Sequence, residues 1–324
     1  MVYSFMFRAV FMGSDTFSLP ILEALISGGR RLSQPVELVG VVTQPDRNVG
    51  RGRKLAPNAV KQRAVAENLV VLQPERLRNE DPVQSVLALR PDLIVVASFG
   101  QILPRALYEA PRFKCLNLHP SLLPRYRGAS PITAPILAGD DLTGATLMQL
   151  SMKMDAGPIV SQEAVRLDGA ETAGELEARL ATKSADLLLR DLPAWLGGQL
   201  EPVAQDESDA TYTTKLTKHD GLLDWWEPAE TLARRVRAYN PWPAAHTYLE
   251  GRQLRVLRAG VESGAAEPGT AVDLREGRLL VGTARGLLAI EEVQFAGGRV
   301  LDVDQLVHGH PKLRSALFDS VAPW

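Results

Sequence analysis

The chain has 324 residues, of which 45% are hydrophobic and 23% charged, a composition typical of soluble globular proteins and not of disordered ones. Since domains usually run about 100 to 150 residues, two domains are expected. The net charge of −2 excludes a surface that is basic throughout, and the single cysteine, Cys115, excludes an internal disulfide and a cysteine-based zinc site.

The first half of the chain alternates apolar runs with helical patterns. The runs are rich in branched side chains and predict strands buried on both faces, at residues 8–14, 36–43, 69–73, 92–98 and 114–119. Helices are predicted between them at 20–29, 58–68 and 80–90. This order predicts right-handed crossovers and an α/β fold with an open, mainly parallel sheet. Ligands of such sheets bind beyond the carboxyl ends of the strands.

Two more strands are predicted at 145–151 and 159–167, followed by a long helix that begins with a Thr-x-x-Glu capping box at 172–175. The segment 197–210, GGQLEPVAQDESDA, is polar and is interpreted as a linker. A helix that stops at Pro241 and a series of short strands with glycine turns follow it. They predict a small antiparallel barrel.

The stretch NLHPSLLPRYRGASP, residues 117–131, places two chemically useful side chains at the end of a strand. Alternation puts Asn117 and His119 on one side, and Pro120 ends the ladder because it has no N–H. An amide could stabilise a developing oxyanion while an imidazole moves a proton. The alternative, that both residues only tie down the loop, stays open.

A carboxylate could complete this site. Asp155 lies in a turn, MDAGPI, after another strand and could orient His119, although an Asp before Ala-Gly can also be a simple turn residue. Cys115 and Ser121 are weaker candidates as nucleophiles, because Cys115 lies in an apolar run and Ser121 lacks a GxSxG elbow. The five histidines show no spacing that indicates a metal site.

Two basic segments are candidates for contact with a polyanion. The Gly-rich loop after the second strand carries Arg47, Arg51, Arg53 and Lys54, a density that favours RNA over a solvated loop. The helix before Pro241 carries Arg234, Arg235 and Arg237 beside two aromatic residues. A nucleic-acid platform and a solvated helix face are both compatible with that second pattern.

Taken together, these segments resemble methionyl-tRNA formyltransferases from about Phe11 to His308. The likeness is carried by VVTQPDRNVGRGRKLAP, PDLIVVASFGQILP, CLNLHPSLLPRYRGASPI, AGDDLTGATLMQL, MDAGPI, TKLTKHDGLLDW and RAYNPWPAA. NLHPSLLPRYRG is shared with other folate-dependent formyltransferases, whereas the basic loop and RAYNPWP favour the tRNA enzyme. The resemblance implies a formyltransferase domain at 1–196, a linker at 197–210 and an OB-like tRNA-binding barrel at 211–324.

The resemblance also implies residue roles. It assigns catalysis to Asn117, His119 and Asp155, and places Arg51 in a mobile loop that engages the tRNA acceptor end. It places the folate beside two loops, Phe99, Gly100, Gln101, Ile102, Leu103 and Pro104 in one and Ser121, Leu122, Leu123 and Pro124 in the other. The chain departs from the family pattern at Pro158, where Asp is usual, at GSDTF in place of GTPDF, and at SFG in place of AYG. Pro158 removes a backbone donor beside Asp155.

The reaction implied is transfer of the formyl group of 10-formyltetrahydrofolate to the α-amine of methionyl initiator tRNA, through a tetrahedral intermediate. No metal is expected, and the enzyme is expected to be a cytoplasmic monomer without a membrane segment, since no apolar run reaches ~18 residues. Three alternatives remain: a small amine such as glycinamide ribonucleotide or an amino sugar as acceptor, RNA binding without catalysis, and hydrolysis of the formyl donor.

Overall fold

A computed structural model describes residues 6–49 and 54–320 of the chain. The chain folds as two compact units. The first contains the chain up to Pro131 together with Leu142–Arg166 and Glu177–Thr213. The second contains Ile132–Asp141, Leu167–Leu176 and the chain from Thr214 onward. Each unit has its own sheet and its own buried core.

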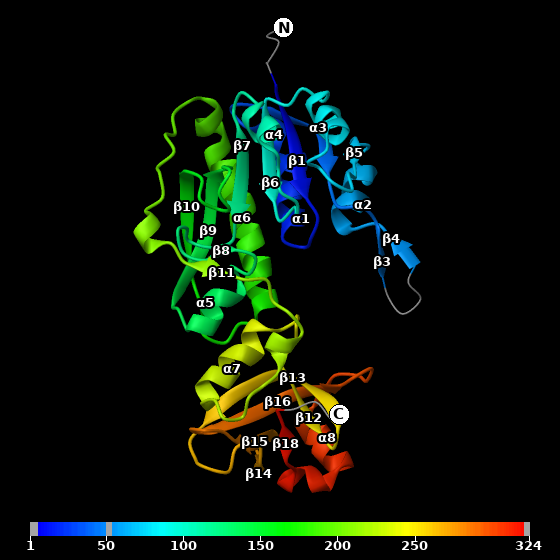
Figure 1. The fold of residues 1–324 in the computed structure, drawn as a ribbon, viewed down its shortest axis with the longest axis vertical. Coiled ribbons are helices and arrows are strands. Elements are labelled where there is room, and N and C mark those ends of the chain that lie inside the picture. The colour runs from blue at the N-terminus through cyan, green and yellow to red at the C-terminus, as the bar shows by residue number, and fades with distance from the viewer. Residues whose placement is uncertain (1–5, 50–53, 321–324) are drawn as a thin grey trace. The chain divides into compact units, whose positions relative to one another are not determined.

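The first unit is built on a seven-stranded sheet of order β10-β9-β7-β6-β1-β2-β5 (Figure 1). Its strands are β1 (Phe7–Gly13), β2 (Val36–Val42), β5 (Val71–Leu72), β6 (Leu93–Ala97), β7 (Cys115–His119), β9 (Leu142–Gln149) and β10 (Ile159–Arg166). The pairs among β1, β2, β5, β6 and β7 are parallel, whereas β9 and β10 are antiparallel additions at one edge. The predicted mainly parallel sheet is therefore confirmed.

Helices connect the parallel strands, as the alternating pattern predicts. They are α1 (Ser18–Gly28), η1 (Gly29–Arg31), α2 (Ala59–Ala66), α3 (Glu80–Leu87) and α4 (Arg105–Glu109). Asn58 caps α2, because its side chain accepts a hydrogen bond from the Lys61 N–H at 2.9 Å. The long helix α6 (Ala173–Leu196) begins with the predicted capping box, in which Thr172 N–H donates to the Glu175 carboxylate at 2.7 Å.

Four short strands and one 3-10 turn complete the first unit: β3 (Arg47–Val49), β4 (Lys54–Ala56), β8 (Arg127–Gly128), η2 (Glu207–Asp209) and β11 (Tyr212–Thr213). β3 pairs with β4 in an antiparallel hairpin, and β8 pairs with β11 in parallel. The predicted strand at 69–73 shrinks to two residues, because β5 lies at the sheet edge and only Val71 and Leu72 pair with β2.

The core of the first unit explains why β7 can carry polar residues. Apolar side chains of β1 and β6, among them Val10, Met12 and Ile94, pack into one buried cluster with Cys115 at the start of β7. Leu116 and Leu118 are also buried. Burial of these side chains stabilises the strand by about 1.5 to 3 kcal/mol each, and this fixes the direction in which Asn117 and His119 project.

The second unit is a curled antiparallel sheet of order β14-β15-β16-β13-β12-β18, with β17 paired to β16. Its strands are β12 (His246–Leu249), β13 (Arg252–Glu262), β14 (Ala271–Arg275), β15 (Arg278–Gly282), β16 (Leu287–Phe295), β17 (Leu301–Asp302) and β18 (Phe318–Asp319). Helical segments are α5 (Thr133–Ala138), η3 (His219–Gly221), α7 (Ala229–Ala238), α8 (Val303–Gly309) and η4 (Pro311–Ser315). This curled antiparallel sheet confirms the predicted OB-like domain.

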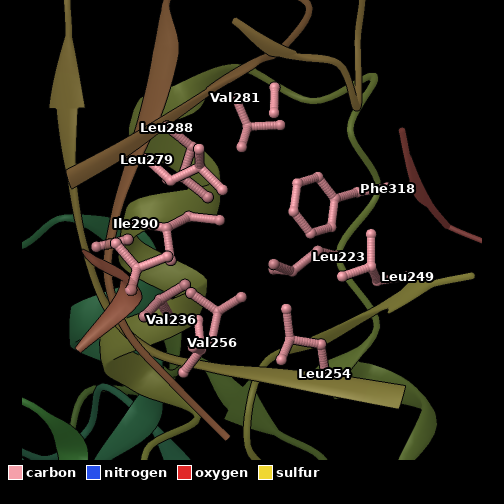
Figure 2. Close-up of a cluster of buried hydrophobic side chains, with 14 of the residues drawn as sticks. Leu223, Val236, Leu249, Leu254, Val256, Leu279, Val281, Leu288, Ile290 and Phe318 are labelled. Atoms are coloured by element: carbon pink, nitrogen blue, oxygen red, sulfur yellow. The ribbon is translucent and has the colours of Figure 1, made fainter. Parts of the chain in front are cut away.

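Period-2 burial builds the core of this second unit. Leu254 and Val256 of β13 point inward, and Arg255 between them is exposed, as expected for a strand with one solvated face. Val236 of α7 and Phe318 of β18 join the same cluster (Figure 2). Within the described residues, no helix has the length and apolar character needed to cross a membrane.

Candidate active site

Two polar side chains project from the end of β7 where an apolar strand would ordinarily continue. Asn117 and His119 share a face of the strand and are 8% and 4% exposed. β7 lies between β6 and β9, with Asn117 opposite Val96 on one side and Met148 on the other. Within the described part of the chain, the Asn117 amide makes no hydrogen bond to protein. Its donors are therefore available to a substrate.

The imidazole of His119 has an oxygen atom near each ring nitrogen. Its Nε2 lies 3.0 Å from the carbonyl oxygen of Tyr126, and because a carbonyl can only accept, Nε2 carries a hydrogen. Its Nδ1 lies 3.8 Å from Oδ1 of Asp155. That separation allows charge attraction but is too long for a hydrogen bond, so Nδ1 can still turn toward a substrate atom.

The Asp155 carboxylate comes from the turn between β9 and β10. Its backbone has φ of 49°, in the left-handed region, and its Oδ2 accepts a hydrogen bond from Gly128 N–H at 2.8 Å. Gly157 is required in this turn, because a Cβ there would lie 1.8 Å from the Gln149 carbonyl oxygen. Pro158 still takes part in backbone pairing, because its carbonyl accepts a hydrogen bond from Gln149 N–H at 2.9 Å.

This arrangement can support acyl-type transfer. An amide with unengaged donors lies on the same strand face as a buried imidazole, and a carboxylate lies near that imidazole. Such a set can hydrogen-bond a developing oxyanion and pass a proton between two reacting nitrogens. In contrast, Cys115 is buried in the apolar cluster, and burial raises the pKa of its thiol far above the usual range. It is therefore packing rather than a nucleophile.

The predicted folate loop after β6 is partly structural. Phe99 is buried, and its carbonyl accepts a hydrogen bond from Gln44 Nε2 at 3.0 Å. Gln101 is also engaged, since its amide bonds to Leu77 N–H and Pro74 C=O at 2.8 and 2.9 Å. Ile102 is 85% exposed, a large apolar side chain open to a ligand. Gly100 is exposed as well, and Leu103 and Pro104 are half-buried.

The second predicted folate loop, 121–124, is held firmly by β9 and β10. Ser121 and Leu123 are buried, and the Ser121 hydroxyl donates to the Arg125 carbonyl at 2.7 Å. The Thr146 hydroxyl donates to the Ser121 carbonyl at 2.6 Å. Leu122 and Pro124 are half-buried. Direct folate contact from this loop would therefore come from these two residues and the backbone.

Comparison with known proteins settles the family. A profile described as "Formyl transferase" matches residues 7–192, and one described as "Formyl transferase, C-terminal domain" matches residues 215–311. A methionyl-tRNA formyltransferase of Chloroflexus aurantiacus is 46% identical over 295 residues, covering 90% of this chain and 93% of the relative. The chain belongs to the methionyl-tRNA formyltransferase family. A member from Bacillus subtilis is 40% identical, covering 94% of this chain and 95% of the relative.

Solved structures agree on the fold. HypX from Aquifex aeolicus, in complex with tetrahydrofolic acid, matches with a TM-score of 0.64 at 17% identity, covering 94% of this chain and 47% of HypX. The N-formyltransferase of Helicobacter canadensis, in complex with folinic acid and dTDP-3-aminofucose, matches with a TM-score of 0.63 at 15% identity, covering 90% and 100% of the two chains. At these identities the match to the formyltransferase fold concerns architecture alone.

The basic segment of this formyltransferase is the hairpin of β3 and β4. Arg47 is exposed, and its guanidinium donates to Gln44 Oε1 at 3.1 Å. Arg51 and Arg53 lie outside the described residues, as does the side chain of Lys54. The root of the hairpin is fixed, because Asp46 forms an ion pair with Lys61 at 2.7 Å and accepts a hydrogen bond from Gln73 at 2.8 Å.

The three predicted arginines of α7 do not form a uniform basic face. Arg235 is engaged in an ion pair with Glu227 at 2.8 Å. Arg234 and Arg237 line a hollow of about 540 Å³ in the second unit, together with Arg258. Burial, and then the neighbouring Arg234, lower the pKa of Arg237. Carboxylates also line this hollow, Asp140, Asp141, Glu171, Glu230 and Glu291.

Sequence reasoning missed several residues around the centre. It treated 197–210 as a linker, yet Gln205 from that segment contacts the Asp155 turn. Arg127 lies in the sequence PRYRG, and nothing in that pattern predicts that its side chain is fully buried. Sequence reasoning also gave no role to Asp15, whose carboxylate accepts a hydrogen bond from Ser98 and whose pKa burial raises. No group of three metal-ligating side chains occurs in the described chain.

Proposed function

We infer that this chain transfers the formyl group of 10-formyltetrahydrofolate to the α-amino group of methionyl initiator tRNA. The observation that carries this inference is the 46% identity to a methionyl-tRNA formyltransferase over 90% of the chain, spanning both units. A match confined to the first unit would leave the acceptor open. The site supports the same chemistry, because Asn117 and His119 share one face of β7 and Asp155, from the turn between β9 and β10, lies near His119.

The reaction begins with the neutral α-amine. A free α-amino group has a pKa of about 7.7 to 8.0, so an appreciable fraction is unprotonated near neutral pH. The amine nitrogen attacks the formyl carbon, and the former carbonyl oxygen becomes an oxyanion. We assign stabilisation of this oxyanion to the Asn117 amide, whose donors are unengaged, and to the protonated imidazole of His119.

Collapse of the tetrahedral intermediate breaks the bond between the formyl carbon and the folate nitrogen. The attacking amine loses one proton and the departing folate nitrogen gains one, so the transfer is balanced without a cofactor that changes oxidation state. In this proposal His119 moves that proton, and Asp155 stabilises the imidazolium across 3.8 Å. The folate would lie against the loops at 99–104 and 121–124.

The tRNA is assigned to the basic hairpin, Arg47, Arg51, Arg53 and Lys54, and to the arginines of α7. The exposed position of Arg47 and the fixed root of the hairpin support this assignment. Phosphates attract clustered cations with little demand on side-chain geometry. A cytoplasmic location belongs to the same proposal, since initiator tRNA must be reached there. A monomeric state also stays a prediction, which sedimentation of the purified chain would check.

One assay tests the proposed function. The chain is incubated with 10-formyltetrahydrofolate and charged initiator tRNA, and the RNA-linked amino acid is analysed for formylmethionine. Formyl transfer to glycinamide ribonucleotide or an amino sugar, with none to tRNA, would indicate a small-amine enzyme. Formate released without an acceptor would indicate hydrolysis, and tRNA binding without folate turnover would indicate an RNA-binding protein.

A further inference from the structure

A three-residue backbone segment, 126–128, lies between the candidate catalytic histidine and aspartate. The Tyr126 carbonyl accepts from His119 Nε2 at 3.0 Å, and the Gly128 N–H donates to Asp155 Oδ2 at 2.8 Å. Both contacts use backbone atoms. The positions of His119 and Asp155 therefore depend on where this short segment lies.

The segment is held in place by residues that follow the predicted linker. β8 pairs in parallel with β11, and Arg127 N–H donates to the Thr211 carbonyl at 2.9 Å. The Tyr126 N–H donates to the Thr211 hydroxyl at 2.8 Å. At Gly128, where φ is +108°, a Cβ would lie 2.4 Å from the Thr213 carbonyl oxygen, so only glycine permits this approach. β8 and β11 are labelled in Figure 1.

The side chain of Arg127 adds a second connection, to Tyr212 and to two residues at the end of the predicted linker. It is fully buried, and its five N–H groups all have partners. Nε and Nη2 donate to Gln205 Oε1 at 3.1 and 2.9 Å. Nη1 and Nη2 donate to the Glu207 carboxylate at 3.2 and 3.0 Å, and Nη1 also donates to the Tyr212 hydroxyl at 3.0 Å.

Gln205 connects Arg127 to the Asp155 turn. Its Oε1 accepts from Arg127, and its Nε2 donates to the Asp155 and Gly157 carbonyls at 2.8 and 2.7 Å. All four hydrogen-bonding positions of the amide are used, and the opposite orientation would set oxygen against two carbonyls. Asp155 lies in the left-handed region, which non-glycine residues seldom adopt, and these two hydrogen bonds help to hold its turn in place.

We propose that Gln205 and Arg127 are positioning residues for the reaction, and that the segment 205–213 is part of the active-site framework rather than a passive connection between the units. The proposal rests on the role of Asp155 in the proposed function. Gln205 acts through the Asp155 turn, and Arg127 acts through both Gln205 and the 126–128 backbone. Neither touches the reacting atoms in this proposal.

Gln205→Glu tests the link to Asp155 selectively. The variant keeps the acceptor for Arg127 and gains an ion pair with it, but it replaces the donor to the two carbonyls with a second oxygen. We expect kcat to fall about 10- to 100-fold, as for displacements of about 1 Å in a catalytic group, with KM for both substrates within twofold. The matched control is Gln199→Glu, which places the same charge at an exposed position of the predicted linker, outside the segment 205–213.

A double-mutant cycle separates positioning from simple support of the fold. If Gln205 acts through Asp155, Gln205→Glu changes kcat less than twofold in an Asp155→Ala background. The same loss in both backgrounds, or wild-type kcat for the folded single variant, overturns the proposal. If Gln205→Glu does not fold, the same kcat measurements are made on Gln205→Met, which fills a similar space without a charge. A wild-type enzyme that makes no formylmethionyl-tRNA would instead refute the proposed function.

Discussion

The proposed catalytic centre and the basic hairpin belong to the same unit but are held by different means. Asn117 and His119 are nearly buried, and hydrogen bonds tie His119 and Asp155 to two other parts of the chain, the segment 126–128 and Gln205. The hairpin is fixed at its root, through Asp46 and Lys61, while Arg47 is exposed. Stabilisation of a transition state requires donors at fixed positions, whereas binding of a phosphate backbone depends mainly on positive charge.

The largest effect is expected from removal of a proposed catalytic side chain. His119→Ala and Asp155→Ala should each lower kcat about 10²-fold or more, because each removes an interaction that we propose to stabilise the transition state. KM for folate and for tRNA should change little. Steady-state formylation of methionyl-tRNA measures this, and wild-type kcat in either variant would contradict its assigned role.

A smaller loss is expected from Gly157→Ala. The new Cβ would meet the Gln149 carbonyl oxygen at 1.8 Å, so the Asp155 turn must shift. Overpacking of this kind costs ~1–3 kcal/mol, which urea unfolding measures, and kcat should fall along with stability. Gly309→Ala is the control, because open space surrounds that position. Equal stability of the two variants would show that the turn is not tightly constrained.

The hairpin should respond in a different way. Arg51→Ala should raise KM for tRNA and reduce the slope of log affinity against log salt by about 1, because one phosphate contact is lost. Folate KM and kcat at saturating tRNA should stay near wild type. Arg30→Ala, at an exposed arginine paired with Glu37, provides the control. Equal damage to folate and tRNA use would argue against a dedicated role in RNA binding.

The smallest effect concerns Glu207, which is 59% exposed. Its hydrogen bond from Arg127 lowers the pKa of its carboxyl below the ordinary 4.5. The stabilisation is therefore present above that ordinary value and is lost as pH falls through the lowered one. Urea unfolding should show Glu207→Gln slightly less stable than wild type at pH 7 and equal to it in strong acid. A difference that persists in acid would assign the effect to something other than this charge.

The sequence predicts the sheet and the polar end of β7 because both follow from periodicity. Alternation places Asn117 and His119 on one face, and the apolar runs at 36–43 and 92–98 correspond closely to β2 and β6. The position of Asp155 beside His119 does not follow from spacing, since it depends on antiparallel β9 and a left-handed turn. The turn pattern indicated only that this carboxylate could orient His119, and the resemblance then assigned both residues to catalysis.

The contacts of Gln205 and Arg127 were beyond prediction from the sequence. The segment 197–210 is polar, with glycines and acidic residues, and so has the composition of a linker. Composition does not reveal that the Gln205 side-chain amide accepts two hydrogen bonds and donates two. A buried arginine is rare and is recognised only when its partners are located in space. Both residues therefore required the structure.

The most direct test of the contrast between the two regions is single-turnover formylation at saturating 10-formyltetrahydrofolate over a range of methionyl-tRNA concentrations, with Asn117→Ala and Arg51→Ala side by side. Asn117→Ala should lower the limiting rate constant about 10²-fold or more while leaving the half-saturating tRNA concentration unchanged. Arg51→Ala should show the reverse pattern. A wild-type limiting rate for Asn117→Ala would contradict the assigned oxyanion role and with it the proposed centre.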